Sequence, residues 1–300
     1  MPFLRAAARS FALFLCVLLP QQAPAETLRH GQGLLWQIEK NGQPVGHLFG
    51  TIHMSDADIL AVPPPVLDAF NAAKNLSVEV ILDGTAVQTL AMAMALPQDQ
   101  RLDAIVPADV FKKAVAASAP YGLEAAQLAR LKPWAVALLI SVPPDEQLRR
   151  AQGALALDMW LQQQAMAQNK PVHALETIAE QVAAFEGLSQ ADQVAQLRSA
   201  SIDLSEKQRY FAEMKKAYLR RDLDAIYRLA RQTTDPGDES LREALEERLF
   251  GVRNRKMAER MAARFDEGGA FVAIGALHLP GESGVLHLLE QRGYTVTRKY

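Results

Sequence analysis

The chain has 300 residues, of which 49% are hydrophobic, so it is long and apolar enough to bury a substantial core. Its 32 basic and 34 acidic residues nearly balance, which gives no reason to expect nucleic acid or an anionic membrane surface as a partner. With one cysteine, the chain has no disulfide framework.

The first 25 residues have the pattern of a secretory signal peptide. Two arginines precede the apolar run 11–19, and residues 23–25 (Ala-Pro-Ala) form a small-residue cleavage site. The run is well short of the roughly 20 residues that span a bilayer. We predict cleavage before Glu26, no stable membrane anchor afterwards, and a periplasmic location. Cleavage would also remove Cys16, so any metal site must use His, Asp or Glu ligands.

Residues 34–49 are predicted to form a β-hairpin, because two apolar segments flank Asn41-Gly42, the strongest short hairpin signal. The second strand runs into Gly50-Thr-Ile-His53. The glycine lets the backbone turn or approach another group closely, and the imidazole follows the carboxyl end of the strand. Prolines 63–65 then favour the start of a helix over residues 66–73.

Residues 75–81 are predicted to be a strand whose apolar side chains share one face, which places Glu79 on the other. An acid in a short apolar strand is costly to bury unless it is paired or holds a metal. The alternative is an edge strand with Glu79 in water.

Residues 84–168 are predicted to be a helical section. Asp158 is the one acid there with apolar neighbours on both sides, and it is either a site residue or an acid that favours a helix start. The predicted helices are Ala- and Leu-rich and separated by prolines, and they cover 86–96, 108–117, 123–131, 133–140 and 154–167.

A short strand over residues 170–176 brings Glu176, which alternatively begins a helix. A second helical section, about 178–265, follows, with a break at 235–238. Its mixed charges are most simply solvated surface and interhelical pairs. Arg253 and Asn254 lie in its last helix, where they face a site or form a surface pair.

A second apolar run that ends in a Gly-x-x-His motif lies at residues 271–278, where the motif is Gly275-Ala-Leu-His278. Open α/β sheets place their sites at the carboxyl ends of strands, so we predict one site for both motifs. The predicted fold is α/β, or α+β, in one domain from residue 26 to 300. A central mixed sheet carries both Gly-x-x-His motifs, flanked by helices and with a large helical insertion.

His53, Glu79 and His278 would supply two imidazole nitrogens and a carboxylate. That set suits a divalent cation with positions left open for water and substrate. A cation so held lowers the pKa of bound water and polarises a carbonyl group, which is hydrolytic chemistry.

Four further residues would complete such a site. Glu176 or Asp158 would be the general base or a further ligand, and Arg253 with Asn254 would stabilise an oxyanion. The sequence contains no His-Glu-x-x-His, Gly-x-Ser-x-Gly, phosphate-binding or dinucleotide-binding motif.

Several short segments, in order, give the chain a resemblance to the TraB/GumN family, the relatives of the Tiki proteases. The resemblance implies an α/β fold with the two motifs facing one site, and a metal-dependent peptidase using manganese or cobalt, or zinc, on a peptide or protein substrate. The segments are Phe49-Gly-Thr-Ile-His53, Val78-Glu-Val80, Leu131-Lys-Pro-Trp134, Leu157-Asp158, Leu175-Glu-Thr177, Arg253-Asn254, Ala273-Ile-Gly-Ala-Leu-His-Leu-Pro-Gly281 and Gly293-Tyr-Thr-Val296.

Residue by residue, the resemblance makes the two histidines and Glu79 the motif residues. Glu176, Arg253 and Asn254 match further family positions. The sequence departs where many relatives have Gly-hydrophobic-Asp, since Ala156 replaces the glycine, which weakens a role for Asp158.

Three functions remain open at this stage. A periplasmic metal-dependent hydrolase predicts cleavage that is lost without either motif histidine. A non-catalytic peptide- or polysaccharide-related binding or regulatory protein would use the same pocket without turnover. A protein in which metal serves only stability would show a higher melting temperature and nothing more.

Overall fold

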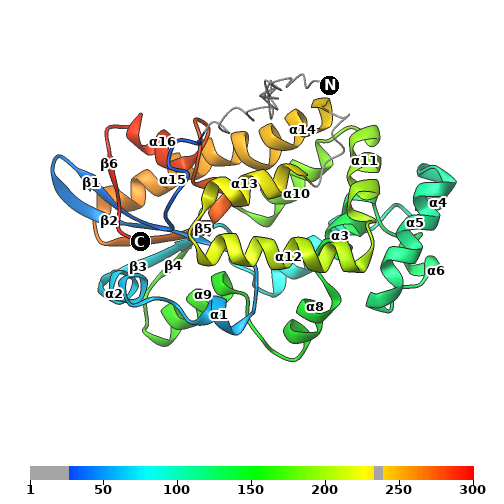
Figure 1. The fold of residues 1–300 in the computed structure, drawn as a ribbon, viewed down its shortest axis with the longest axis horizontal. Helices are drawn as coiled ribbons and strands as arrows, with labels where there is room; N and C mark the ends of the chain where they lie inside the picture. The colour runs from blue at the N-terminus through cyan, green and yellow to red at the C-terminus, as the bar shows by residue number, and fades with distance from the viewer. Residues whose placement is uncertain (1–26, 233–238) are drawn as a thin grey trace, which may run out of the picture.

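The computed structural model describes residues 27–232 and 239–300 (Figure 1). The predicted signal peptide with its cleavage site, and the predicted break at 235–238, lie outside these residues. Among the described residues, no helix combines the length and the hydrophobicity needed to cross a membrane.

The described strands form one mixed sheet of six strands in the order β4-β3-β5-β2-β1-β6. Strands β4, β3, β5 and β2 are parallel neighbours, while β1 pairs antiparallel with both β2 and β6. The strands are β1 (Leu35–Lys40), β2 (Gln43–Thr51), β3 (Asn75–Val78), β4 (Val172–Ala174), β5 (Ala270–Gly275) and β6 (Thr295–Arg298). The predicted α/β fold is confirmed.

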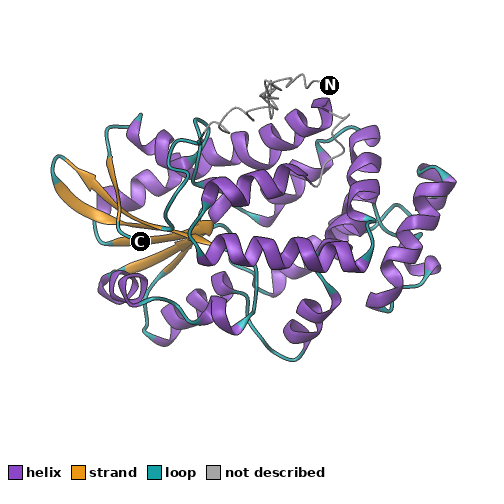
Figure 2. Ribbon diagram, in the orientation of Figure 1, coloured by secondary structure: helices purple, strands orange, loops and turns teal. Residues whose placement is uncertain are grey.

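Helices make up most of the rest of the described chain (Figure 2). Before β4 come α1 (Ala57–Leu60), α2 (Pro64–Ala72), α3 (Gly84–Met94), α4 (Leu102–Ile105), α5 (Ala108–Ser118), the 3₁₀ turn η1 (Ala119–Tyr121), α6 (Ala125–Leu128), α7 (Pro133–Ser141), α8 (Pro144–Ala151) and α9 (Leu157–Ala167). After it come α10 (Ile178–Glu186), α11 (Gln190–Ala200), α12 (Leu204–Leu219), α13 (Leu223–Gln232), α14 (Glu239–Glu246), the π-helical turn η2 (Glu247–Gly251), α15 (Val252–Glu267), the 3₁₀ turn η3 (Ala276–His278) and α16 (Val285–Glu290).

The predicted hairpin forms at Asn41-Gly42. Both residues have positive φ, 53° and 73°, which a two-residue hairpin turn of the type that matches strand twist requires. Register shifts by one residue between Ile38 and Glu39, a β-bulge near the turn. The turn and the bulge together set the register of β2 against β1, and so they set which residues lie at the carboxyl end of β2.

Helices cover both faces of the sheet (Figure 1). Helix α15 packs on β2 and β5 on one face, while α9 packs on β3 and β4 on the other. Helix α2 lies on the side of α9, where Phe70 meets Phe271 of β5 edge to face, with ring centroids 5.5 Å apart. The sheet is thus the middle of three layers.

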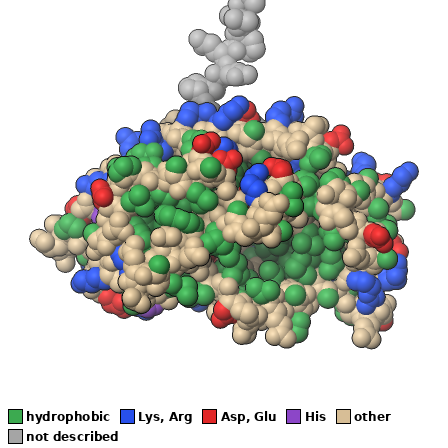
Figure 3. Space-filling model, turned by 90° about the horizontal axis from the view of Figure 1, so that it is seen from below, with side chains coloured by type: hydrophobic (Ala, Val, Ile, Leu, Met, Phe, Trp, Pro, Cys, Tyr) green, Lys and Arg blue, Asp and Glu red, His purple; other side chains and the backbone are tan. Residues whose placement is uncertain are grey.

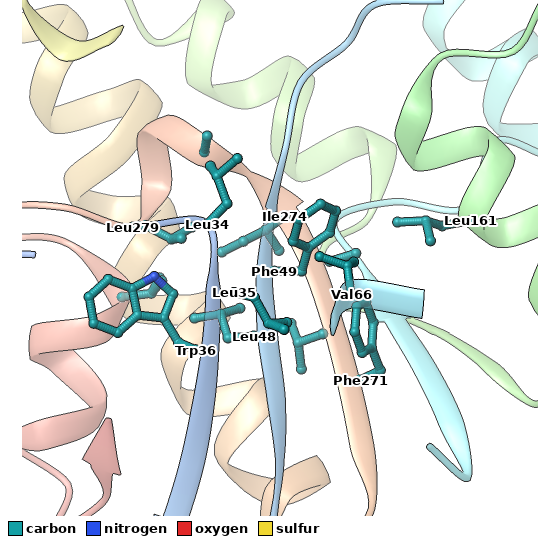
Figure 4. Packing of buried hydrophobic residues seen from close by; sticks show 14 of the residues in the cluster. Leu34, Leu35, Trp36, Leu48, Phe49, Val66, Leu161, Phe271, Ile274 and Leu279 are labelled. Carbon is teal, nitrogen blue, oxygen red and sulfur yellow. The ribbon is translucent and has the colours of Figure 1, made fainter. Parts of the chain in front are cut away.

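The main hydrophobic core lies on both sides of β1, β2 and β5 (Figure 4). Leu48 and Phe271 are inaccessible to solvent, as expected for central strands with apolar residues on both faces. The helices to the right of the sheet in Figure 1 contain a second core, in which Leu102, Val110 and Ile140 are fully buried. Our expectation of a single domain from 26 to 300 stays a prediction.

Strand β3 differs from its prediction. It ends at Val78 and lies between β4 and β5, so all four of its residues are buried, Ser77 included. Glu79 follows the strand end instead of alternating within it. The alternative of an edge strand with Glu79 in water is wrong, because β4 is the edge strand and the Glu79 side chain is only 12% exposed.

Candidate active site

The parallel strands bring one candidate residue each to the same edge of the sheet. His53 follows β2, Glu79 follows β3, Glu176 follows β4, and His278 ends the turn after β5. The backbone pairing continues past the strand ends, where the Glu176 amide donates to the Glu79 carbonyl oxygen at 2.7 Å. The four side chains therefore start from a fixed scaffold at the carboxyl edge, where sites of α/β sheets lie.

The His53 imidazole is held by Asp158, in the first turn of α9. Nδ1 of His53 lies 2.9 Å from Oδ1 of Asp158. Because a carboxylate only accepts hydrogen bonds, Nδ1 donates to Asp158, which leaves Nε2 as the nitrogen that faces the site. The His53 side chain is 62% exposed, so this nitrogen lies at an open part of the site.

Helix α8 holds the loop that carries His53. The buried Glu146 carboxylate accepts the Ser55 backbone N–H at 2.9 Å and pairs with Arg150 at 2.8 Å. Arg150 in turn donates to the His53 carbonyl oxygen. This loop is therefore tied to the helical part of the molecule as well as to the sheet.

The second motif histidine is buried and held by Asn254. Nδ2 of Asn254 donates to the Ser283 carbonyl oxygen at 2.8 Å, which turns Oδ1 toward Nδ1 of His278, 2.5 Å away. Since the amide oxygen accepts, Nδ1 of His278 carries the proton and Nε2 has the lone pair. The Phe250 ring packs against the imidazole with ring centroids 5.2 Å apart.

Arg253 joins the two strand-end glutamates. Its Nη2 lies 2.7 Å from Oε2 of both Glu79 and Glu176, and its Nε lies 3.0 Å from both oxygens of Glu176. The Glu176 side chain is fully buried. A buried carboxylate is tolerated where such a planar, charge-assisted pair compensates it.

Because Gly275 has no side chain, Oε1 of Glu79 can lie close to its backbone. Its backbone N–H donates to Oε1 of Glu79 at 2.7 Å. A Cβ at this position would lie 3.1 Å from the same oxygen and 3.5 Å from the His278 ring. The same oxygen is 3.7 Å from Nε2 of His278, so Glu79 and the second histidine face each other.

A π-helical turn precedes the residues of α15 that enter the site. It covers Glu247–Gly251, and the Leu249 carbonyl oxygen accepts a hydrogen bond from Nη1 of Arg253 at 3.2 Å. π-helical turns occur frequently at functional sites. This one lets Phe250, Arg253 and Asn254 all point toward the ends of the strands.

The charges of the site act on its titratable groups. Burial lowers the pKa of His278 to about 4, so the ring is neutral at pH 7. Burial raises the pKa of Glu79, but the positive groups around it and the Gly275 N–H outweigh this and lower it. Partial loss of water lowers the pKa of His53, but the charge of Asp158 and the hydrogen bond to it outweigh this and raise it.

The donors at this edge fit a divalent cation in their chemistry. In both histidines Nδ1 is held by an oxygen and Nε2 is left to face the site, which is the arrangement that orients metal-ligating imidazoles. A cation would have to displace the proton that the raised pKa keeps on Nε2 of His53. Glu79 adds an ionised carboxylate. Within residues 27–232 and 239–300, however, no three His, Cys, Asp or Glu side chains are close enough together to hold an ion as they stand.

A pocket of about 320 Å³ opens in front of this edge. His53, Glu79, Asp158 and Arg253 line its polar side, together with Arg150. Figure 3 shows, on the face seen from below, a hollow around which hydrophobic side chains gather. The volume is within the range of small-molecule and peptide side-chain sites.

The structure brings the seven residues singled out in the sequence, Asp158 included, to one site, but in different settings. His53, Glu79 and Arg253 line the pocket, whereas Glu176 and Asn254 are buried behind it at 2% and 1% exposure. The expected role of Asn254 at an oxyanion does not fit, because its amide is used by His278 and Ser283. Glu176, enclosed by Arg253, is likewise badly placed for a general base.

Asp158 was a candidate general base or ligand in the sequence, with a role weakened by Ala156. In the structure Ala156 is the helix N-cap with no need for a glycine, and Asp158 holds His53. Sequence reasoning missed other residues of the site. Glu146 and Arg150 were not considered at all. The sign available in the sequence was Glu146 four residues before Arg150, just after Pro143-Pro144. This spacing predicts an ion pair on one face of a helix.

Known proteins resemble this chain over the region that contains the candidate residues. The sequence model of the TraB/PrgY/gumN family matches residues 34–298, which include every strand and every candidate residue. The chain belongs to this family. No solved structure matches it significantly.

Curated relatives of this family member are named metalloproteases. Metalloprotease TIKI1 of Homo sapiens is 23% identical over 94% of this chain and 63% of its own length. The metalloprotease TIKI homologue of Amphimedon queenslandica is 27% identical over 88% of this chain and 61% of its own length. The chain therefore spans about three fifths of the length of these relatives.

Proposed function

We propose that this TraB-family protein is a metal-dependent peptidase whose site is the pocket at the carboxyl edge of the sheet. The observation that carries the proposal is the pair of oriented imidazoles, His53 held by Asp158 and His278 held by Asn254, beside the ionised Glu79. The metalloprotease names of the relatives support it.

His53, Glu79 and His278 are the residues that would hold the ion. A divalent cation there would supply a polarised water and a Lewis acid toward a peptide carbonyl. Manganese or cobalt is our first choice of metal, followed by zinc. The ligands in the structure are a nitrogen-rich, thiol-free set, which all three metals accept.

The chain's own residues prepare the reaction. Asp158 lines the pocket and fixes the tautomer of His53, so it is the candidate general base near the open side. Asn254 holds the second imidazole turned inward, and burial keeps it neutral. Arg253 pairs with both Glu79 and Glu176 and offsets one of their two negative charges, which reduces the repulsion of a polarised carbonyl oxygen or a substrate carboxylate.

The test is metal binding followed by cleavage. Purified protein is loaded with Mn²⁺, Co²⁺ or Zn²⁺, and its metal content is measured beside a His53→Ala/His278→Ala variant. His47→Ala is the matched control, since His47 lies on β2 outside the pocket lining. We expect about one metal per chain, lost only in the double variant, and metal-dependent cleavage of a peptide library. Equal metal content in all three proteins would refute the proposed site.

A binding or regulatory protein is the second candidate, and one observation favours it. Glu79 is already paired with Arg253 and the Gly275 N–H, so the three proposed ligands are not gathered around one point. In that case peptides would bind without turnover under any of the three metals.

We also propose export to the periplasm, on the basis of the arginines, apolar run and Ala-Pro-Ala sequence at residues 1–25. N-terminal sequencing of protein from the periplasmic fraction of a Gram-negative host tests this. A mature chain that begins at Glu26 is the expected result, and an intact leader in the cytoplasm would contradict it.

A further inference from the structure

The pocket in front of the sheet edge has two unlike halves. The strand ends, α8, α9 and α15 provide its ionised groups, whereas α3, α7 and α10 provide a wall without charges. This wall contains Leu90, Trp134, Leu138, Val182 and Phe185. Trp134 and Phe185 stack in parallel with ring centroids 5.4 Å apart, so the wall is rigid as well as apolar.

Large hydrophobic side chains also reach solvent around this pocket. Leu82, Leu138 and Met159 line it and are 40%, 39% and 36% exposed. They come from separate parts of the chain, namely the segment before α3, α7 and α9. Apolar side chains gathered in this way at a concave site mark a surface that a ligand covers.

The ionised groups of the pocket already have partners within the protein. Arg150 is paired with Glu146, Arg253 with Glu79 and Glu176, and His53 with Asp158. The wall of α3, α7 and α10 itself offers a charged ligand side chain no ionised partner, so such a side chain would lose its hydration there. An apolar side chain, in contrast, would gain by leaving water.

The apolar surface continues beyond this pocket. Leu138 also lines a second cavity of about 320 Å³, whose lining includes Phe250 and Leu277. Phe250 packs on the His278 ring, and Leu277 precedes His278 in the chain. Apolar surface therefore lies on more than one side of the candidate ligands.

We propose that the wall of α3, α7 and α10 is a specificity subsite that takes a large apolar side chain of a peptide, next to the bond presented to His53, Glu79 and His278. This rests on the proposed function in placing the scissile bond there. The subsite makes apolar peptide segments the substrate class and disfavours peptides with an acidic or basic residue at that position.

Binding of short peptides tests the subsite apart from cleavage. The probes are fluorescein-labelled Gly-Ala-Gly-Xaa-Gly-Ala-Gly peptides in which Xaa is Phe, Ala or Asp, followed by fluorescence polarisation in EDTA. Burial of a Phe side chain predicts about tenfold or more tighter binding of the Phe peptide than of the Ala or Asp peptide. Equal affinities, or no detectable binding of any of the three, would overturn the inference.

Two matched variants locate the effect. Leu138→Gln should reduce the preference for Phe by about threefold or more, because it places an amide in the wall. Leu148→Gln is the control, since Leu148 is 58% exposed on α8 and does not line the pocket. An unchanged preference in the Leu138 variant would also count against the subsite.

The same peptides with Mn²⁺ present then report on the proposed function. Preferential binding of the Phe peptide with no cleavage under any metal would keep the subsite and reject the peptidase. Cleavage without preferential binding of the Phe peptide would keep the peptidase and reject the subsite.

Discussion

Arg253 is the group whose removal should disturb the protein most. Arg253→Met keeps a side chain of similar length but leaves Glu176, which is fully buried, and Glu79, which is 12% exposed, without a cationic partner. Removal of one partner of a buried pair costs about 3–5 kcal/mol of unfolding free energy. For a chain of this size, that corresponds to a fall in melting temperature of roughly 6–20 °C.

The assay is urea unfolding at pH 7, with Arg260→Met as control. Arg260 lies on the same helix and binds Glu180 through two nitrogens at 2.8 Å, but it is 42% exposed, so its loss should cost about 1 kcal/mol or less. The deficit of the Arg253 variant should shrink below about pH 5, because unpaired buried carboxyl groups take up protons and become neutral. Equal losses in both variants would refute the assignment of Arg253 as the counter-ion of buried carboxylates.

Three further outcomes are expected. Glu180→Gln should cost about 1 kcal/mol at pH 7 and little at pH 2 in urea unfolding. Arg260 holds the pKa of Glu180 down at about 2, so the stability that the pair adds is present above about pH 4.5 and is lost as the pH falls toward 2. Glu146→Gln should speed hydrogen exchange of the Ser55 amide, since its acceptor loses its charge; an unchanged rate would show that the loop is held by other contacts. Gly42→Ala should cost about 1 kcal/mol through its φ of 73° alone, because a Cβ there meets no atom within 4 Å, and a neutral result would contradict the turn geometry.

The sheet could be predicted from the sequence because its strands carry local signals. Asn41-Gly42 determines the hairpin, and the apolar runs that end at Gly50 and Gly275 are the two parallel neighbours β2 and β5. The end of β3 could not be predicted, since Val80 continues the alternation beyond Val78. The side chain of Glu79 instead accepts the Gly275 N–H, a contact 196 residues away that the local pattern does not indicate.

The sequence predicted which residues belong to the site better than it predicted the contacts between them. A histidine or an acid at a strand end is visible in the sequence, whereas the partner that fixes it depends on the folded chain. Arg253 reaches Glu176 across 77 residues and Asp158 reaches His53 across 105, and no local pattern indicates either pair. The roles expected for Asn254 and Glu176 stay predictions, and the burial of both side chains could not be predicted because it depends on packing that periodicity does not describe.

The division of the pocket between strand ends and inserted helices has a consequence for how such a protein can change. Residues 84–168 leave the sheet at the end of β3 and return to it at β4, so their length and shape can vary while Glu79 and Glu176 stay in place. The same insertion supplies α3 and α7, which form part of the uncharged wall, and α8 and α9, which carry Arg150 and Asp158. Selectivity and chemistry are therefore divided between different helices of the insertion. A new preference for ligands could be grafted by exchanging α3 and α7 while α8 and α9, which hold His53, stay in place.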